Sequence, residues 1–162
     1  MPPAPRPTPM SRPLPLPLAY SCSGCSSAAQ LANHLAVRLD RAGMVEMSCI
    51  AGVGGGVPSL VRKALDAAAE GRPILAIDGC ALACTQASLA RHGVRPTAHV
   101  QLATLGVRKA YHADFDPQQA DELYAGLAEQ SRAMSELHAA KSEGGGCACA
   151  EARRRAQEAP GG

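Results

Sequence analysis

Apolar residues group into four short segments along the chain, and a stretch with helical spacing follows each of them. The four segments cover residues 16–20, 44–50, 74–77 and 99–107. In the first segment Leu16, Leu18 and Tyr20 alternate with other positions, which predicts a short strand that ends at Ser21-Cys22. The third segment is apolar at successive positions, so we expect a strand that is buried on both faces, as in a parallel sheet.

Helices are predicted over residues 28–42, 59–70 and 82–91, and from residue 117 onward. Ser26 or Ser27 can cap the first helix, and Gly43 ends it. Asp116-Pro117 is a strong start signal for the last helix. The residues expected to face inward in the second helix are Leu60, Val61, Ala64, Leu65 and Ala68, and those in the last helix are Ala120, Leu123, Leu127, Met134 and Leu137.

Alternating strands and helices predict a compact three-layer α/β domain, with a mostly parallel sheet of about four strands and helices on both faces. We expect this domain to span residues 18–140. Residues 1–17 are crowded with proline, which predicts a leader without helix or central strand. Residues 141–162 are Gly-rich, Ala-rich and charged, which predicts a disordered tail that carries Cys147 and Cys149.

The composition argues against several classes of protein. The chain has no Trp, one Phe and three Tyr, so its core must be aliphatic, and aromatic stacking on nucleic-acid bases is not expected. The formal charge of +2 comes mostly from interspersed signs, so we expect neither nucleic acid nor membrane as a partner. A secretory signal and a bilayer-spanning apolar run are both missing from the first seventeen residues, so we expect a cytoplasmic protein.

Five of the seven cysteines follow predicted strands, and they are Cys22, Cys25, Cys49, Cys80 and Cys84. The carboxyl ends of parallel strands share one edge of a sheet, beside helix N-termini that favour the thiolate form of cysteine. Thiolates suit zinc, cuprous copper or iron–sulfur clusters. The spacing lacks the paired CxxC of a zinc ribbon, and any one of these cysteines could instead be a small apolar residue in a buried turn.

Other motifs are less informative. The glycine-rich stretch 52–56 does not complete GxGxxG because Val57 stands at the last required glycine, so we interpret it as allowing close backbone approach. Asp78 either orients a ligand or simply forms an Asp-Gly turn, and the sequence leaves both interpretations open. The histidines have no ligand spacing and are expected at the surface or satisfied in the core: His34, His92, His99, His112 and His138.

Three motifs in this order resemble the DGC-domain family of bacterial and archaeal proteins. They are Cys22-Ser23-Gly24, Cys49-Ile50-Ala51-Gly52-Val53-Gly54 and Ile77-Asp78-Gly79-Cys80-Ala81-Leu82-Ala83-Cys84. Members of this family are proposed to bind zinc, and the resemblance, which spans residues 18–127, implies the ligands Cys22, Cys49, Cys80 and Cys84. Cys25 is additional to that set, either as an alternative ligand or as a thiol available for exchange.

The sequence therefore predicts a small cytosolic protein that holds zinc through four thiolates at the carboxyl edge of the sheet. Four thiolates would close the site, and no catalytic base is evident, so whether the chain is an enzyme stays open. The alternative is a thiol-based redox, sulfur-transfer or iron–sulfur electron-carrier protein that uses the same cysteines. Cys22-Ser23-Gly24-Cys25 suggests thiol exchange, but the element order lacks the antiparallel half of a thioredoxin-like fold. The metal ion is the one partner that the sequence predicts.

Overall fold

One parallel sheet of four strands forms the middle of the molecule. The computed structural model describes residues 15–157, with side chains described as far as residue 143. The strands are β1 Leu18–Ser21, β2 Glu46–Met47, β3 Ile74–Asp78 and β4 Ala98–Gln101, in the order β2-β1-β3-β4. All three neighbouring pairs are parallel, which confirms the predicted sheet.

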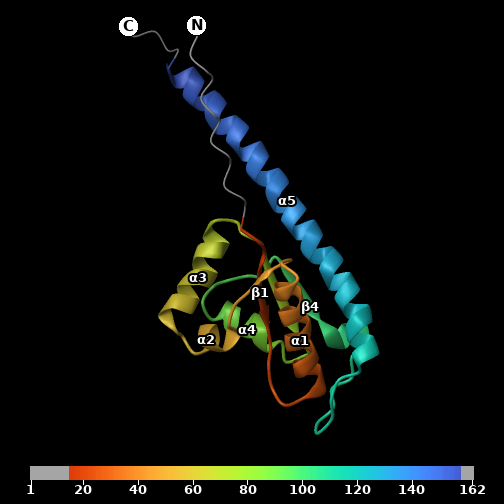
Figure 1. Cartoon of the computed structure of the whole chain (residues 1–162). Coiled ribbons are helices and arrows are strands. Elements are labelled where there is room, and N and C mark those ends of the chain that lie inside the picture. Colours follow the sequence, from red (N-terminus) through yellow and green to blue (C-terminus); the bar gives the residue numbers. More distant parts are fainter. Residues whose placement is uncertain (1–14, 158–162) are drawn as a thin grey trace, which may run out of the picture.

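Helices cover both faces of this sheet (Figure 1). They are α1 Ser27–Arg41, α2 Ile50–Gly54, α3 Pro58–Ala69, α4 Cys84–Ala90 and α5 Pro117–Gln157, with a short 3₁₀ helix, η1 Leu102–Leu105, after β4. α1 and α5 pack on one face around an apolar cluster that includes Ala19, Leu75 and Ile77, and α2, α3 and α4 pack on the other around Leu18 and Ile74. The predicted three-layer α/β domain is therefore confirmed.

The two middle strands, β1 and β3, are buried along their whole length. β3 lies between β1 and β4, so both of its edges are paired and both of its faces are covered. The unbroken apolar run at residues 74–77 correctly predicted this central position. Cys22 and Cys80 therefore follow the carboxyl ends of two strands that are buried at every position.

Two of the predicted strands are shorter than expected. β2 has only two residues, and the chain turns into α2 at Ile50, where Gly52 leaves the space that the Leu60 side chain fills. β4 ends at Gln101, and the segment predicted to continue it forms η1 before the positive φ of Gly106 ends that turn. A short apolar run fits a turn or a short helix as well as a strand, and Val53 of α2 and Leu102 of η1 are buried without one, which is why these boundaries were wrong.

Helix boundaries agree better with the predicted ones. Ser26 caps α1 by accepting the Ala29 N–H, and Asp116 caps α5 by accepting the Gln118 N–H at 2.9 Å. α4 starts at Cys84, two residues later than predicted, because Ala83 takes a left-handed conformation with φ 48°. This unusual residue lies in the turn between two of the candidate cysteines.

Three apolar residues that were expected to be buried are exposed. In α3, Ala64 and Ala67 are buried, whereas Leu65 is 43% exposed and Ala68 is also exposed, so the buried stripe is narrower than predicted. In α5, Leu137 is 63% exposed because it lies beyond Met134, the last buried residue described on this helix. Figure 1 shows the later turns of α5 projecting past the sheet.

The ends of the chain are described only in part. Residues 1–14 of the predicted leader lie outside the described residues, and the carbonyl of Leu16 accepts a hydrogen bond from Arg72 Nε at 2.7 Å. α5 continues to Gln157, into the segment where the composition predicts a tail. Cys147 and Cys149 fall within this helix, and their side chains lie outside the description.

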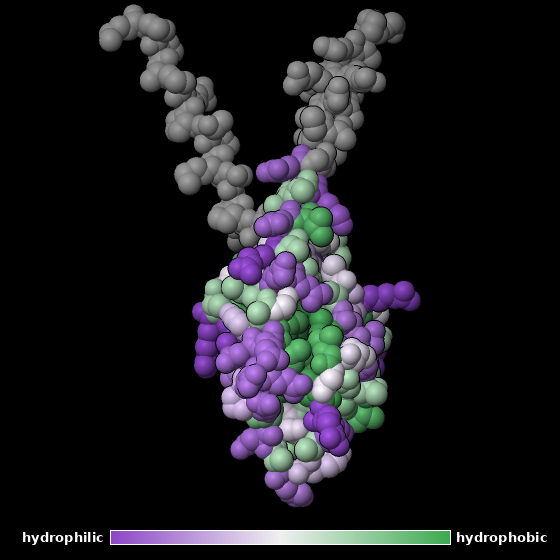
Figure 2. All heavy atoms as spheres, turned by 90° about the vertical axis from the view of Figure 1, so that its right-hand side faces the viewer, coloured by the Kyte–Doolittle hydropathy of each residue, from purple (hydrophilic) through white to green (hydrophobic). Residues whose placement is uncertain are grey.

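The face that carries α5 has an apolar hollow between this helix and β4. Green residues gather there in Figure 2, and the lining includes Val100, Leu105, Leu123 and Leu127. Across residues 15–157, no helix combines the length and the apolar composition needed to cross a membrane.

Candidate functional site

The five candidate cysteines all lie near the carboxyl edge of the sheet. Cys22 directly follows β1, Cys49 precedes α2, and Cys80 follows β3. Cys25 lies just before α1, and Cys84 is the first residue of α4. Each of the five thiols is free of a disulfide. The position at one edge agrees with the prediction from strand order.

Cys22 is the buried member of this group. Its Sγ accepts a hydrogen bond from the Gly79 N–H at 3.1 Å. Burial raises the pKa of the Cys22 thiol to about 11, while the Gly79 N–H opposes this rise and the charges of Asp78, Cys84 and Cys80 add to it. Without a cation nearby, Cys22 is therefore a neutral thiol at neutral pH. Asp78 and Cys80 flank Gly79 in the chain, so the hydrogen bond places the Cys22 sulfur beside the turn that carries both residues.

Gly79 is required where the turn after β3 meets the start of α1. A Cβ atom at this position would lie 2.4 Å from the Ala28 carbonyl oxygen and 2.8 Å from the Ala29 nitrogen. These are backbone atoms of a helix, which cannot move aside as a flexible side chain can. The missing side chain therefore lets the Cys80 turn pack directly against the helix that follows Cys22 and Cys25.

Asp78 caps α4 from the end of the neighbouring strand. It is 1% exposed, and its Oδ1 accepts the Thr85 N–H at 2.8 Å while Oδ2 accepts the Gln86 N–H at 3.2 Å. The residue in the usual cap position, Ala83, has no side-chain acceptor. The carboxylate of Asp78 thus holds the start of α4, and its role in orienting a ligand stays a prediction.

His99 completes the surroundings of Asp78, and the sequence analysis missed it. Its Nε2 lies 3.0 Å from Asp78 Oδ2. Two residues later on β4, Gln101 Nε2 donates to the Cys80 carbonyl at 3.1 Å. Gln101 pairs in register with Asp78, so both contacts follow from the β3–β4 register. The spacing of residues along the chain could not reveal His99. Its position on the predicted strand next to β3 could have indicated that it lies close to Asp78.

Lys109 is a second residue that the sequence analysis missed. The loop that carries it is fixed to α1, because Ala110 N–H donates to Ser27 Oγ at 3.0 Å and Ser27 N–H donates to the Ala110 carbonyl at 2.9 Å. A hydrogen bond with Tyr111 raises the pKa of Lys109, and the charges of Cys80 and Cys25 add to the rise. The Lys109 ammonium itself lies over the Tyr111 ring, 5.1 Å from the ring centroid.

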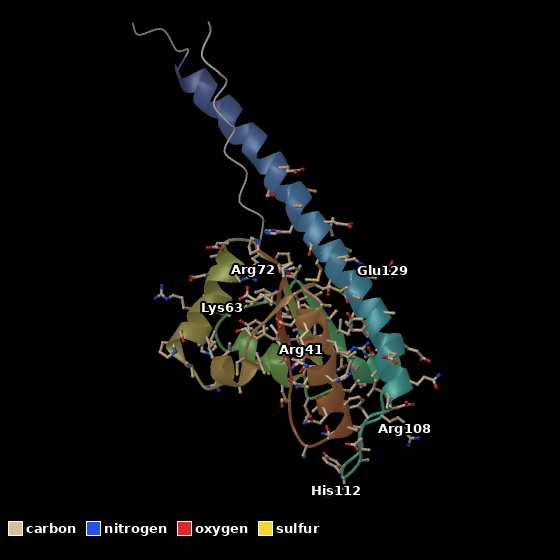
Figure 3. All side chains as sticks on the ribbon, in the orientation of Figure 1. Arg41, Lys63, Arg72, Arg108, His112 and Glu129 are labelled. Atoms are coloured by element: carbon tan, nitrogen blue, oxygen red, sulfur yellow. The ribbon has the colours of Figure 1, made fainter. Side chains whose placement is uncertain are left out.

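Figure 3 locates this loop within the molecule. Arg108 and His112 mark the loop at the lower end, where the strands have their carboxyl ends. Arg72 and Lys63 lie at the opposite end of the strands. The loop and the cysteine turns thus occupy the same end of the molecule.

Cys49 lies beside the turn that follows β1. It is exposed, and it lines a surface hollow together with Ser21 and Ser23. Ser21 Oγ is buried in this region and lacks a hydrogen-bond partner among the described residues. β2 and β3 flank β1 in the sheet. Cys49, which follows β2, therefore lies on one side of the Cys22 turn, and the turn after β3 lies on the other.

The thiol groups, as placed, do not surround a single point. Within residues 15–143, no group of three or more His, Cys, Asp or Glu side chains is arranged to hold a metal ion. The donor types nevertheless suit a soft cation, since five free thiols lie at one edge and Cys22 is held in place by a backbone N–H. The Gly79 N–H thus brings the Cys80 turn against the Cys22 sulfur, and among residues 15–143 no coordination shell is closed.

Comparisons with known proteins agree with the motifs. The sequence model of a family described as the DGC domain matches residues 18–127. The chain is 58% identical over 110 residues to the "Anaerobic and virulence modulator AnvM" of Pseudomonas aeruginosa, and the aligned part covers 68% of this chain and 81% of that protein. No solved structure matches the chain.

Proposed function

Because this chain belongs to the DGC domain family, we propose that it is a small metal-binding protein that holds one zinc ion at the carboxyl edge of its sheet. The proposed ligands are Cys22, Cys49, Cys80 and Cys84, with Cys25 as an alternative ligand or an exchanging thiol. The observation that carries this proposal is the gathering of five free cysteines from three separate turns at one sheet edge.

Hydrogen bonds from neighbouring residues would hold the proposed cysteine ligands in position before zinc binds. Gly79 N–H fixes the Cys22 sulfur, Gln101 fixes the Cys80 carbonyl, and Asp78 fixes the first turn of α4, where Cys84 lies. A bound zinc ion would supply positive charge that keeps the thiols deprotonated and would join the three turns. Since Cys25, Cys49 and Cys84 are exposed, their side chains can turn toward Cys22 without displacing core residues.

Four thiolates leave no open coordination position, so a structural or carrier role fits better than zinc catalysis. Five thiols without a disulfide fit a reducing compartment, and we propose that the protein acts in the cytoplasm. The relative from P. aeruginosa is named an anaerobic and virulence modulator, and a regulatory role for this chain would suit an oxygen-sensitive thiol site.

Zinc titration of a cysteine panel tests the proposed ligand set. Each of the four proposed cysteines is replaced by Ser in the reduced full-length chain, and zinc stoichiometry is measured by competition with a chromophoric chelator. We expect one zinc per wild-type chain and a strong loss of affinity for each single variant. A matched control replaces Cys147 and Cys149 by Ser and should bind zinc as the wild type does. Retention of normal affinity by all four single variants would reject this set.

Thiol exchange is the second candidate function, and one observation favours it. Cys25 is exposed next to the buried Cys22 in a CxxC turn, while no metal-holding group is formed in the described part of the chain. Thiol titration before and after mild oxidation separates the two functions. Reversible loss of two thiols that a chelator does not affect would support exchange, and a brown anaerobic preparation would instead support an iron–sulfur cluster.

A further inference from the structure

Three hydrogen-bond donors converge on the carboxylate of Asp78. Two of them are the backbone N–H groups of Thr85 and Gln86, at the start of α4. The third is the His99 side chain, whose Nε2 lies 3.0 Å from Oδ2. His99 is thus the side-chain donor that β4 contributes to a carboxylate from β3.

The start of α4 depends on this carboxylate. Ala83 precedes the helix in a left-handed conformation, which is costly for a residue with a Cβ, and it offers no side-chain acceptor. The Ala83 N–H donates to the Cys80 carbonyl at 3.1 Å, so this strained turn directly connects the two cysteines. Because Asp78 accepts the N–H groups of Thr85 and Gln86, the two residues after Cys84, its orientation sets the position of Cys84 at the first helical turn.

His99 is well placed to fix that orientation. Its side chain is 22% exposed, whereas the side chain of Asp78 is 1% exposed, so the hydrogen bond joins a partly exposed ring to a buried carboxylate. A buried carboxylate needs all of its donors, because losing one leaves an acceptor that water cannot easily reach.

We propose that His99 is a positioning residue for the cysteine site: through its hydrogen bond to Asp78 it fixes the Cys80–Cys84 turn and thereby the affinity of the site for zinc. This inference rests on the proposed function. His99 acts as a donor to Asp78 and does not bind the metal. Removing a residue that orients metal ligands through hydrogen bonds typically lowers the affinity for the metal by about 10–100-fold.

The test compares two replacements of similar size in the full chain, His99→Gln and His99→Met. The glutamine amide can donate a hydrogen bond to Asp78, whereas the methionine cannot. His92→Met serves as the control, because His92 Nε2 lies 2.8 Å from the Val53 carbonyl of α2, a contact that involves neither Asp78 nor the Cys80–Cys84 turn. Zinc affinity of the reduced proteins is measured by chelator competition, and folding is checked by circular dichroism.

We expect His99→Met to lose zinc affinity by about 10–100-fold, while His99→Gln and His92→Met stay within about threefold of the wild type. Equal loss in His99→Met and His99→Gln would overturn the inference, because that result indicates a direct ligand or a purely structural role. Normal affinity in His99→Met would overturn it as well. A wild-type chain that binds no zinc would overturn both the proposed function and this inference.

The wild-type chain offers a readout that does not depend on a folded methionine variant. The ring nitrogen signals of His99 in an NMR spectrum, assigned with His99→Gln, should shift when one equivalent of zinc is added. Those of His92 should not shift. If the chain binds zinc and the His99 signals do not shift, the inference is overturned. A histidine that is hydrogen-bonded to Asp78 should change its environment when zinc binds at the Cys80–Cys84 turn.

Discussion

At the scale of single residues, Asp78, Gly79 and Cys80 act as one unit. Asp78 caps α4, Gly79 admits the backbone of α1 and donates to the Cys22 sulfur, and the Cys80 carbonyl is held by Gln101. The cap needs the carboxylate of Asp78 and the close approach needs the missing side chain of Gly79, whereas the Cys80 contact uses a backbone carbonyl. The motif therefore builds the meeting point of two strands and two helices, whether or not its cysteine binds a metal.

Replacing Gly79 by Ala should destabilise the fold by about 2–3 kcal/mol or more, because the new Cβ meets the Ala28 and Ala29 backbone. Chemical denaturation measures this loss. Gly24→Ala is the matched control in the neighbouring turn, where the nearest atom to a Cβ is the Ala29 Cβ at an ordinary 3.8 Å. A similar stability of the two variants would contradict the close approach at Gly79.

Cys22 should react far more slowly with iodoacetamide than Cys25 does in the metal-free reduced chain. Burial keeps Cys22 protonated, with a pKa of about 11, whereas Cys25 is exposed. The ordinary pKa of a cysteine thiol is 9.0. At mildly alkaline pH the thiolate fraction of Cys22 is therefore about a hundredfold lower than that of an ordinary cysteine. Peptide mass spectrometry after short exposure gives the order of modification. Cys22 modified as fast as Cys25 would show that the site opens readily.

The sequence allowed the cysteines to be placed at one edge because strand order alone determines where strand ends lie. It could not reveal His99, since its partner Asp78 lies on another strand and leaves no mark in local spacing. The role of Asp78 as a cap for α4 was hidden for the same reason: the helix that it caps starts six residues later.

At the scale of elements, the short strand β2 depends on its charged neighbours. Glu46 on β2 binds both Lys63 and Arg72, and Arg72 also holds the Leu16 carbonyl before β1. On the outer side of β2, Asp40 Oδ1 accepts the Met47 N–H at 2.7 Å. The sequence predicted a longer strand because it showed the apolar pattern but could not show that pairing stops after two residues.

Glu46→Gln should reduce stability near neutral pH by about 1 kcal/mol or less, since the pairs are partly exposed. Hydrogen bonds from Lys63 and then Arg72 lower the pKa of Glu46 below its ordinary 4.5. The wild-type advantage is therefore complete above pH 4.5 and is lost as the pH falls through the lowered pKa. Urea unfolding of both proteins across acidic pH measures this, and a difference that is independent of pH would contradict it.

At the scale of the whole molecule, alternating strands and helices were sufficient to predict the three layers. The extent of α5 was harder to predict, because its later residues are Ala-rich and charged and carry no periodic apolar stripe. Met134 is the last buried residue described on this helix, and Leu137 is already exposed. Among the residues up to 143, the buried positions on α5 thus end at Met134.

A chain of residues 15–143 should unfold at the same temperature as the full-length protein, because it keeps every buried residue described on α5. A chain of residues 15–126 is the comparison. It lacks four buried residues, Leu127, Ala128, Ser131 and Met134, and it should unfold at a lower temperature or fail to fold. Calorimetry distinguishes the two, and a marked loss in the longer chain would show that residues after 143 contribute to the core.

The most direct test of the central claim is the metal content of the full-length protein, purified anaerobically in reductant without added metal. Elemental analysis should find one zinc per chain, and the fourfold variant with Ser at residues 22, 49, 80 and 84 should contain none. A freshly purified, reduced wild-type protein that contains no zinc would contradict the proposal, as would zinc retained in the fourfold variant.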